Sequence, residues 1–200
     1  MRRKNLQTND PELIKRLLTE SIVGHLGVLT PAGYPRVVPV NFVAEGPTIY
    51  FHGAISGEKH TAMKEHPQVT FCVYREYSVI PSFWLTEKAV GATQFYESVQ
   101  LDGTISFIDN PDMRAAALDA LMRKYQPEGN HAILAESTDH HARVISRTQV
   151  YRLDPTRIDC KVKLGQDLEK AHRQDLVTNL RNRGTPLDLA TANAIEQIAE

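Results

Sequence analysis

Strand-like runs joined by short turn-forming segments place the strongest constraint on how this chain folds. The runs IVGHLGVLT and RVVPVNFV flank PAGYP, which is dense in residues that favour turns, and this pattern predicts a β-hairpin. A third run, TIYFHG, follows Gly46-Pro47, and a fourth, QVTFCVYREY, follows Pro67. Because tight turns cannot connect parallel strands, these runs predict a sheet that is mostly antiparallel.

The rest of the chain predicts helices inserted between further strands. Helices are expected to start at Pro11 and Pro111, and the chain is expected to be helical after Gln166, with a break at Gly184. FYESVQLDGTISFID predicts a bent strand or a strand pair broken at Asp102-Gly103, and ARVISRTQVYRLD predicts another strand. Residues 78–93 show no clear period and predict a loop. Closure of these strands into a small barrel would remove exposed sheet edges.

Composition argues against several classes of protein. A net charge of -1 argues against a general binder of nucleic acid or of membrane surfaces. Cys72 and Cys160 fit neither a disulfide framework nor a paired zinc motif, so no metal site is predicted. The segment MRRKNLQTND lacks the apolar core of a secretory signal, and no apolar run approaches the roughly 20 residues of a membrane span. We therefore expect a cytoplasmic protein.

The stretch FHGAISGEKH contains the most informative single residue, Lys59, which stands in the first turn of a predicted helix. The helix dipole disfavours a cation there by up to about 1 kcal/mol. Ser56 is expected to cap the helix and Gly57 to let a ligand approach the backbone, while a phosphate beside Lys59 would offset the dipole cost. Arg36 would add a bidentate contact if the barrel brings it near. The pattern favours a phosphate site, and the alternative is a solvated surface lysine.

In their order and spacing these motifs resemble the FMN-binding split barrels of the pyridoxamine 5'-phosphate oxidase superfamily, and within it the nitroimidazole-resistance-like branch. The resemblance rests on PRVVPVNF, FHGAISGEKHTAMKEHPQVTFCVY, YESVQLDGTISFID and KVKLGQ. It implies a mainly β (α+β) fold, namely a six-stranded antiparallel split β-barrel with flanking helices over residues 6–166. Residues 167–200 would form a C-terminal helical extension, packed on the barrel or on the partner subunit, or else a lid over the cofactor. The resemblance also implies a homodimer with FMN at the subunit interface.

The resemblance further implies which residues bind FMN. Arg36 and Lys59 match the phosphate ligands, with Ser56 and Gly57 alongside them. The remaining cofactor-binding candidates lie on three strands: Val38, Pro39, Val40 and Asn41 on the first, Tyr96, Ser98 and Val99 on the second, and Lys161, Lys163 and Gln166 on the third. His52 is the candidate catalytic residue, because the resistance-like proteins carry a histidine near the redox site in a similar stretch. The alternative is that His52 only hydrogen-bonds a strand end.

The function implied is that of an FMN-dependent oxidoreductase, which passes electrons from a reductant to a small acceptor such as a nitroaromatic compound. Residues 78–93 lack the Arg-and-Ser signature of the true pyridoxamine 5'-phosphate oxidases, and the C-terminus lacks their tryptophan, so that activity is not expected. Glu58 replaces a more basic residue often found before the lysine, and its charge would weaken phosphate binding. The alternative is a non-catalytic haem- or flavin-binding or regulatory split barrel, with His131, His140 and His141 as candidate haem ligands.

Overall fold

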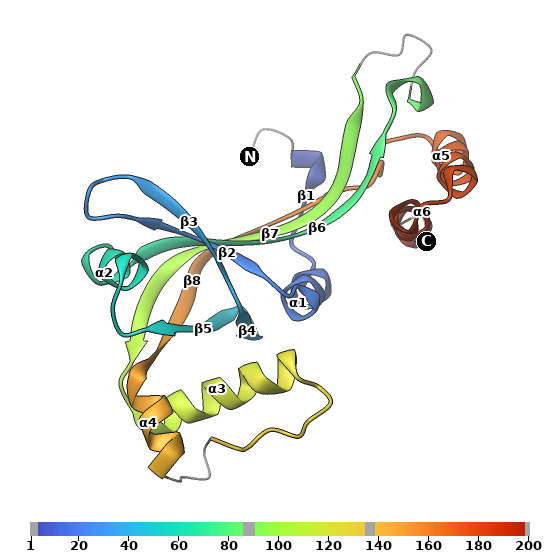
Figure 1. The fold of residues 1–200 in the computed structure, drawn as a ribbon. Helices are drawn as coiled ribbons and strands as arrows, with labels where there is room; N and C mark the ends of the chain where they lie inside the picture. Colours follow the sequence, from blue (N-terminus) through green and yellow to red (C-terminus); the bar gives the residue numbers. More distant parts are fainter. Residues whose placement is uncertain (1–3, 86–90, 135–138, 199–200) are drawn as a thin grey trace. The chain divides into compact units, whose positions relative to one another are not determined.

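A computed structural model describes residues 4–85, 91–134 and 139–198 (Figure 1). Its strands are β1 (Gln7–Thr8), β2 (Gly24–Leu29), β3 (Pro35–Val40), β4 (Phe42–Glu45), β5 (Thr48–Ala54), β6 (Gln68–Ile80), β7 (Thr93–Ile108) and β8 (Thr148–Lys163). Its helices are α1 (Pro11–Glu20), α2 (Glu58–Glu65), α3 (Pro111–Tyr125), α4 (Asp139–Arg147), α5 (Lys170–Arg183) and α6 (Pro186–Ile198), with 3-10 turns η1 (Lys4–Leu6) and η2 (Ser82–Trp84). Within these residues, no helix is both long and apolar enough to cross a membrane.

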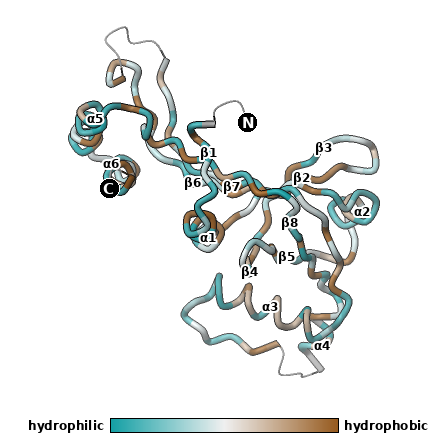
Figure 2. Tube along the Cα trace, turned by 180° about the vertical axis from the view of Figure 1, so that it is seen from behind, coloured by the Kyte–Doolittle hydropathy of each residue, from teal (hydrophilic) through white to brown (hydrophobic). Residues whose placement is uncertain are grey.

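The chain divides into two compact units. Unit 1 comprises Met1–Asp10, Tyr74–Ser98 and Asp159–Glu200, and unit 2 comprises Pro11–Val73 and Val99–Ile158. The long strands β6, β7 and β8 each contribute residues to both units. Over much of β6 and β7, buried residues alternate with less buried ones, because successive side chains point to opposite faces. Figure 2 shows the mixed hydropathy of these strands.

The sheet has the strand order β3-β2-β6-β7-β8-β5-β4. The pairs β2–β3, β2–β6, β4–β5 and β5–β8 are antiparallel, as the turn-linked strands predict. The two ends of this order, β3 and β4, are separated in the chain by Asn41 alone. Residues 35–45 therefore form one interrupted strand that supplies both edges. Counted as one, and without the two-residue β1, the eight strands become the six long strands that the resemblance implies. The predicted fold class is confirmed.

The core of unit 2 contains a group of packed aromatic rings among its aliphatic side chains. Phe42 and Phe71 meet edge to face with ring centroids 4.9 Å apart, and Phe51 stacks on Tyr151 at 5.0 Å. Helix α3 is tied to this core by the Tyr125 hydroxyl, which accepts a hydrogen bond from the Phe42 amide at 2.8 Å. Strand β5, which leads into the connection that carries Ser56, Gly57 and Lys59, is therefore packed against closely fitting aromatic side chains.

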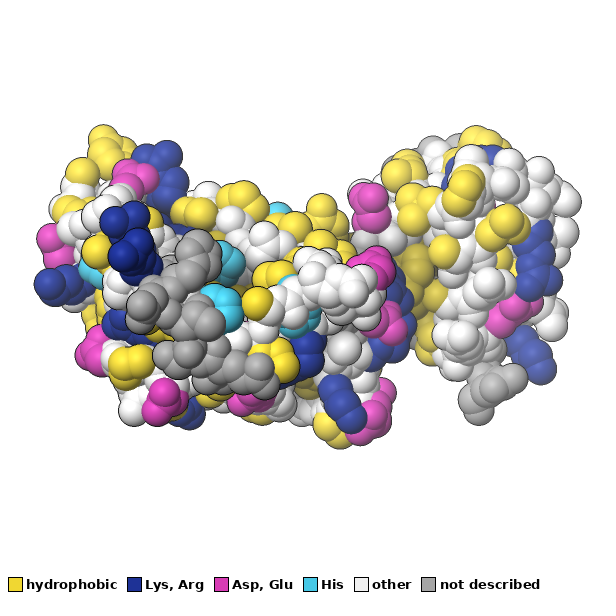
Figure 3. Space-filling view, turned by 60° about the horizontal axis from the view of Figure 1, so that its bottom comes forward, with side chains coloured by type: hydrophobic (Ala, Val, Ile, Leu, Met, Phe, Trp, Pro, Cys, Tyr) yellow, Lys and Arg dark blue, Asp and Glu magenta, His cyan; other side chains and the backbone are white. Residues whose placement is uncertain are grey.

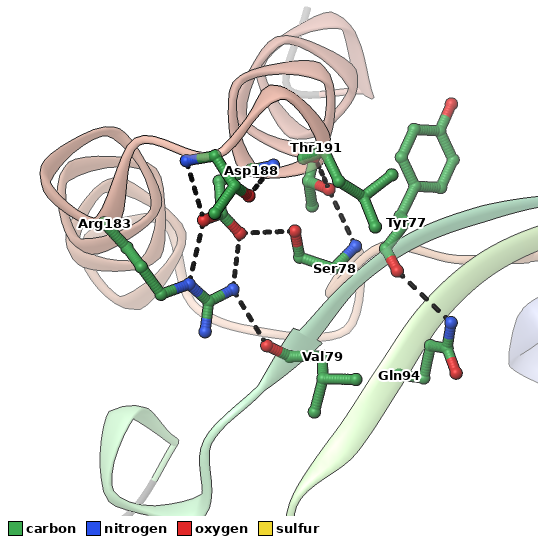
Figure 4. A network of polar contacts seen from close by, with 9 residues as sticks. Tyr77, Ser78, Val79, Gln94, Arg183, Asp188 and Thr191 are labelled. Atoms are coloured by element: carbon green, nitrogen blue, oxygen red, sulfur yellow. Dashed lines mark hydrogen bonds and ion pairs between the residues drawn. The ribbon is translucent and has the colours of Figure 1, made fainter.

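Unit 1 packs the C-terminal helices against the ends of β6 and β7. Leu176, Leu180 and Ile195 join Ile80 and Phe95 in one buried cluster. The predicted break between the helices is confirmed, because Gly184 ends α5 in the left-handed conformation with φ 71°. A buried polar network around Asp188 fixes this helix pair to β6 (Figure 4).

Three local predictions differ in part from the structure. Strand β7 continues through Asp102-Gly103 without a break, because a Cβ at Gly103 would lie 2.3 Å from the Asp154 carbonyl oxygen, so this glycine allows close strand approach. Residues 139–147 form helix α4, which packs Ile145 on α3, and the strand starts only at Thr148. In the predicted loop 78–93, β6 extends to Ile80 and η2 follows, while residues 86–90 lie outside the described residues.

Candidate functional site

The connection between β5 and α2 shapes the candidate site in unit 2. Gly57 is the N-cap residue of α2 with φ 105°, a left-handed conformation that favours glycine, and the helix has no side-chain cap. The prediction that Ser56 caps the helix was wrong, because Gly57 occupies the N-cap position and Ser56 comes one residue too early. The amide groups of the first helical turn have no partners within the helix, and such groups bind anions well.

The Lys59 side chain folds back over the end of β5. Its Nζ donates to the His52 carbonyl oxygen at 3.4 Å and lies 5.6 Å from the centroid of the Phe51 ring. Gly53 leaves room for the Lys59 side chain in this position, because a Cβ at residue 53 would lie only 3.0 Å from Nζ. Burial lowers the pKa of Lys59. Within the described part of the chain, no carboxylate lies within ion-pair distance of Nζ, so this ammonium group is suited to an external anion.

Tyr151 holds the connection in place from below. Its hydroxyl donates to the Ala54 carbonyl oxygen at 3.2 Å and lies 3.0 Å from Nδ1 of His60. Burial raises the pKa of Tyr151 to about 12, so the hydroxyl stays protonated and can donate at neutral pH. One side chain of β8 therefore anchors both the end of β5 and the first turns of α2.

Arg36 reaches the same helix end from β3, and there it forms an ion pair that the sequence did not reveal. Its guanidinium nitrogen lies 3.1 Å from Oε1 of Glu58, with the two side chains 53% and 54% exposed. An acidic residue is favoured in the first turn of a helix, which gives Glu58 a physical reason to be there. The structure thus brings Arg36 to Glu58, the residue that precedes Lys59 in the helix. Arg36 and Glu58 are 22 positions apart in the chain, and nothing in their spacing indicates the contact, because only the strand pairing brings them together.

Strand β3 and the residue that follows it, Asn41, contain the residues predicted to lie along the flavin ring. Pro39 and Asn41 are exposed, Val38 is half-buried, and Val40 is buried in the core. Val40 therefore offers a ligand only its backbone. Because β3 is a terminal strand in the sheet order, its outer backbone groups have no sheet partner among the described strands.

The other predicted cofactor residues belong mostly to unit 1. Tyr96 and Lys163 line a cavity of about 520 Å³ together with Lys161, whose Nζ lies 5.4 Å from the Tyr96 ring centroid. The amide group of Gln166 is engaged at both ends, since it donates to the Val162 carbonyl and accepts from the Leu164 amide. Ser98 is half-buried.

Val99 belongs to unit 2 and is fully buried, so only its backbone is available to a ligand.

His52 points away from the core on β5, next to the buried Phe51. Its pKa is lowered, first by partial burial and then by the positive charge of Lys59, so the imidazole is neutral at pH 7. A neutral imidazole both donates and accepts hydrogen bonds. The structure therefore places a neutral histidine and a lysine ammonium along the same short segment.

Three histidines, His131, His140 and His141, were predicted as candidate haem ligands. Nδ1 of His131 lies 3.3 Å from the carbonyl oxygen of its neighbour Ala132, and His141 is half-buried on α4. The side chain of His140 lies outside the described residues. Across the described ranges, no group of three or more His, Cys, Asp and Glu side chains is placed to hold a metal ion. Both basic and acidic side chains are scattered over the face in Figure 3, in keeping with the net charge of -1.

Solved structures share this fold. A candidate 5-nitroimidazole antibiotic resistance protein from Bacteroides thetaiotaomicron is 20% identical with a TM-score of 0.65, covering 78% of this chain and 86% of its own. The flavocytochrome Anf3 from Azotobacter vinelandii is 25% identical with a TM-score of 0.66, and the match covers 79% of this chain and 69% of the flavocytochrome. An FAD and heme binding protein from Mycobacterium smegmatis is 19% identical with a TM-score of 0.65, and the match covers 78% of this chain and 73% of that protein.

Sequence comparison with family models gives the assignment. No curated protein sequence matches this chain. The model described as pyridoxamine 5'-phosphate oxidase matches residues 10–162, a range that contains β2 to β7, most of β8 and the whole β5–α2 connection. The resemblance seen in the motifs is therefore confirmed, and the chain belongs to the pyridoxamine 5'-phosphate oxidase family.

Proposed function

We propose that this protein binds FMN and acts as an FMN-dependent oxidoreductase, which passes electrons from a reductant to a small acceptor of the nitroaromatic class. The observation that carries the proposal is Lys59, a half-buried ammonium group at a helix N-terminus without a carboxylate partner in the described part of the chain. Membership of the family supports it. Likeness to a flavocytochrome, at 25% identity, is a further support for a flavin.

The residues of the β5–α2 connection fit a phosphate group. Lys59 and Arg36 supply two positive charges, and the first turn of α2 supplies amide donors at the positive end of the helix dipole. Gly57 leaves the approach open, since a Cβ there would meet no heavy atom within 4 Å. A phosphate would thus meet charge, donors and space at one place, with Ser56 beside it.

The outer edge of β3 fits a planar ring. Its unpaired backbone groups would contact the flavin along Val38, Pro39, Val40 and Asn41. A bound flavin accepts electrons from a reductant and passes them on, while the protein supplies binding and orientation. We assign His52 as the candidate catalytic residue, because its neutral imidazole stands exposed next to the lysine that would hold the phosphate. Its role would be to hydrogen-bond the flavin or the acceptor.

The proposal includes a homodimer with FMN at the subunit interface. On the β2–β3 hairpin, Tyr34 and Val37 are 71% and 65% exposed, although both are large and hydrophobic. A partner subunit that covers this hairpin would remove these side chains from water. Tyr96, Ser98, Val99, Lys163 and Gln166 remain proposed cofactor residues on the basis of the resemblance. The cytoplasmic location likewise remains part of the proposal.

Absorption spectra of the purified protein test the oxidoreductase activity. With FMN added under anaerobic conditions, NADH or NADPH is expected to bleach the visible flavin band, and a nitroaromatic acceptor is expected to restore it. Binding of FMN without reduction by either nucleotide would contradict an oxidoreductase that uses these donors and favour the non-catalytic alternative. A Soret band after addition of haem, without FMN uptake, would favour haem binding.

A further inference from the structure

Glu58 lies at the centre of the proposed phosphate site with the wrong sign of charge. Its carboxylate accepts a hydrogen bond from Arg36 at 3.1 Å, and it stands in the first turn of α2, directly before Lys59. It therefore uses the two features that would attract a phosphate, namely an arginine donor and the positive end of a helix. A phosphate that binds Arg36 must compete with this carboxylate.

We propose that Glu58 is an internal competitor for the phosphate of the flavin nucleotide, and that it keeps FMN an exchangeable ligand rather than a permanently bound group. This inference rests on the proposed function. Arg36 and Lys59 bring two positive charges, of which Glu58 cancels one. A phosphate monoester carries about -1.5 to -2 charges at pH 7, so the remaining net side-chain charge of the site falls about 0.5 to 1 positive charge short of neutralising FMN.

The exposure of the ion pair decides how strongly Glu58 competes. Arg36 and Glu58 are each about half exposed, at 53% and 54%, and ion pairs of this kind contribute little net free energy. A phosphate can therefore displace the carboxylate from Arg36. After displacement the Glu58 charge stays close to the phosphate, because both lie at the same helix end. The repulsion lowers FMN affinity by a moderate factor without closing the site.

The variant Glu58→Gln tests this inference, with Glu65→Gln as its matched control. Glu65 is exposed in the last turn of the same helix, so its replacement removes the same charge far from the site. Fluorescence titration should show FMN binding roughly five- to tenfold tighter in Glu58→Gln, with a correspondingly slower dissociation in stopped-flow experiments. Riboflavin, which lacks the phosphate, should bind wild type and variant alike. Glu65→Gln should match wild type for both ligands.

A second variant checks that the effect passes through Arg36. In an Arg36→Met background, Glu58→Gln should give a smaller gain in FMN affinity, because the guanidinium that Glu58 occupies is gone. Unchanged or weaker FMN binding in Glu58→Gln, in a wild type that binds FMN, would overturn the competitor role while leaving the proposed function intact. Absence of FMN binding in wild type, Glu65→Gln and Glu58→Gln alike would instead overturn both.

Discussion

Replacing Lys59 with Met should weaken FMN binding roughly 30- to 100-fold and leave riboflavin binding unchanged. The ammonium group is the charge of the proposed site that no carboxylate within the described residues neutralises, and a hydrogen bond to a charged group contributes about 2–3 kcal/mol. Met retains the apolar contact with Phe51 and Tyr151. Fluorescence titrations with the two ligands measure both effects.

Lys64 provides the matched control for this prediction. It is exposed in the last turn of the same helix, so Lys64→Met removes an identical charge at the opposite end of α2. FMN affinity should stay within about twofold of wild type, since surface charges at this distance are largely screened. Equal losses in the two variants, or a loss of riboflavin affinity in Lys59→Met, would show that Lys59 does not bind the phosphate.

Replacing Asp188 with Asn should destabilise unit 1 by about 2–3 kcal/mol, because it removes the buried charge to which Arg183, Ser78 and Thr185 donate hydrogen bonds. Asp188 is 1% exposed and is bound by Arg183, by the Ser78 hydroxyl at 2.5 Å and by the Thr185 amide (Figure 4). The network connects α5 and α6 to β6. Denaturation in urea, followed by the fluorescence of Trp84, which lies against Arg183, measures the loss.

The same carboxylate makes stability depend on pH. Hydrogen bonds, first from Arg183 and then from Ser78 and Thr185, hold the pKa of Asp188 well below its usual range in the folded protein. The unfolded chain therefore takes up the proton first as the pH falls. The stabilisation is fully present above pH about 4, the ordinary pKa of an aspartate, and is lost progressively as the pH falls towards the folded pKa. Asp188→Asn should lack this acid-dependent component.

An exposed ion pair on the same helices serves as the control. Arg181 and Glu196 lie 2.7 Å apart, and about half of each side chain is exposed. Glu196→Gln should therefore change the free energy of unfolding by less than about 1 kcal/mol. A similarly small effect of Asp188→Asn would contradict the role assigned to the buried network.

Local signals in the sequence predicted much of the fold. The proline at position 11 starts α1, Asn110 caps α3 through its side chain, and Gly184 separates the last two helices. Each of these rests on the chemistry of a few neighbouring residues. Gly103 was interpreted as a strand break, whereas a glycine is required there because β8 approaches closely. That contact comes from residues about fifty positions away in the chain, so no local signal indicates it.

In the candidate site, too, the features that depend on neighbouring residues could be predicted, and those that depend on distant contacts could not. Lys59 was identified from its place in a helix, which is a local property. The position of Glu58 before Lys59 predicted that its charge would weaken phosphate binding, but its ion pair with Arg36 depends on the strand pairing and could not be predicted from spacing. The helical state of residues 139–147 likewise depends on packing against α3.

The comparison of FMN with riboflavin in the wild-type protein tests the central claim most directly, because the two ligands differ only in the phosphate. Fluorescence titration should give saturable binding of FMN at one equivalent per chain, with affinity at least about tenfold higher than for riboflavin. Raising the salt concentration should narrow this difference, as expected for exposed charges. Equal affinity for the two flavins, or no binding of either, would contradict a phosphate site at Lys59.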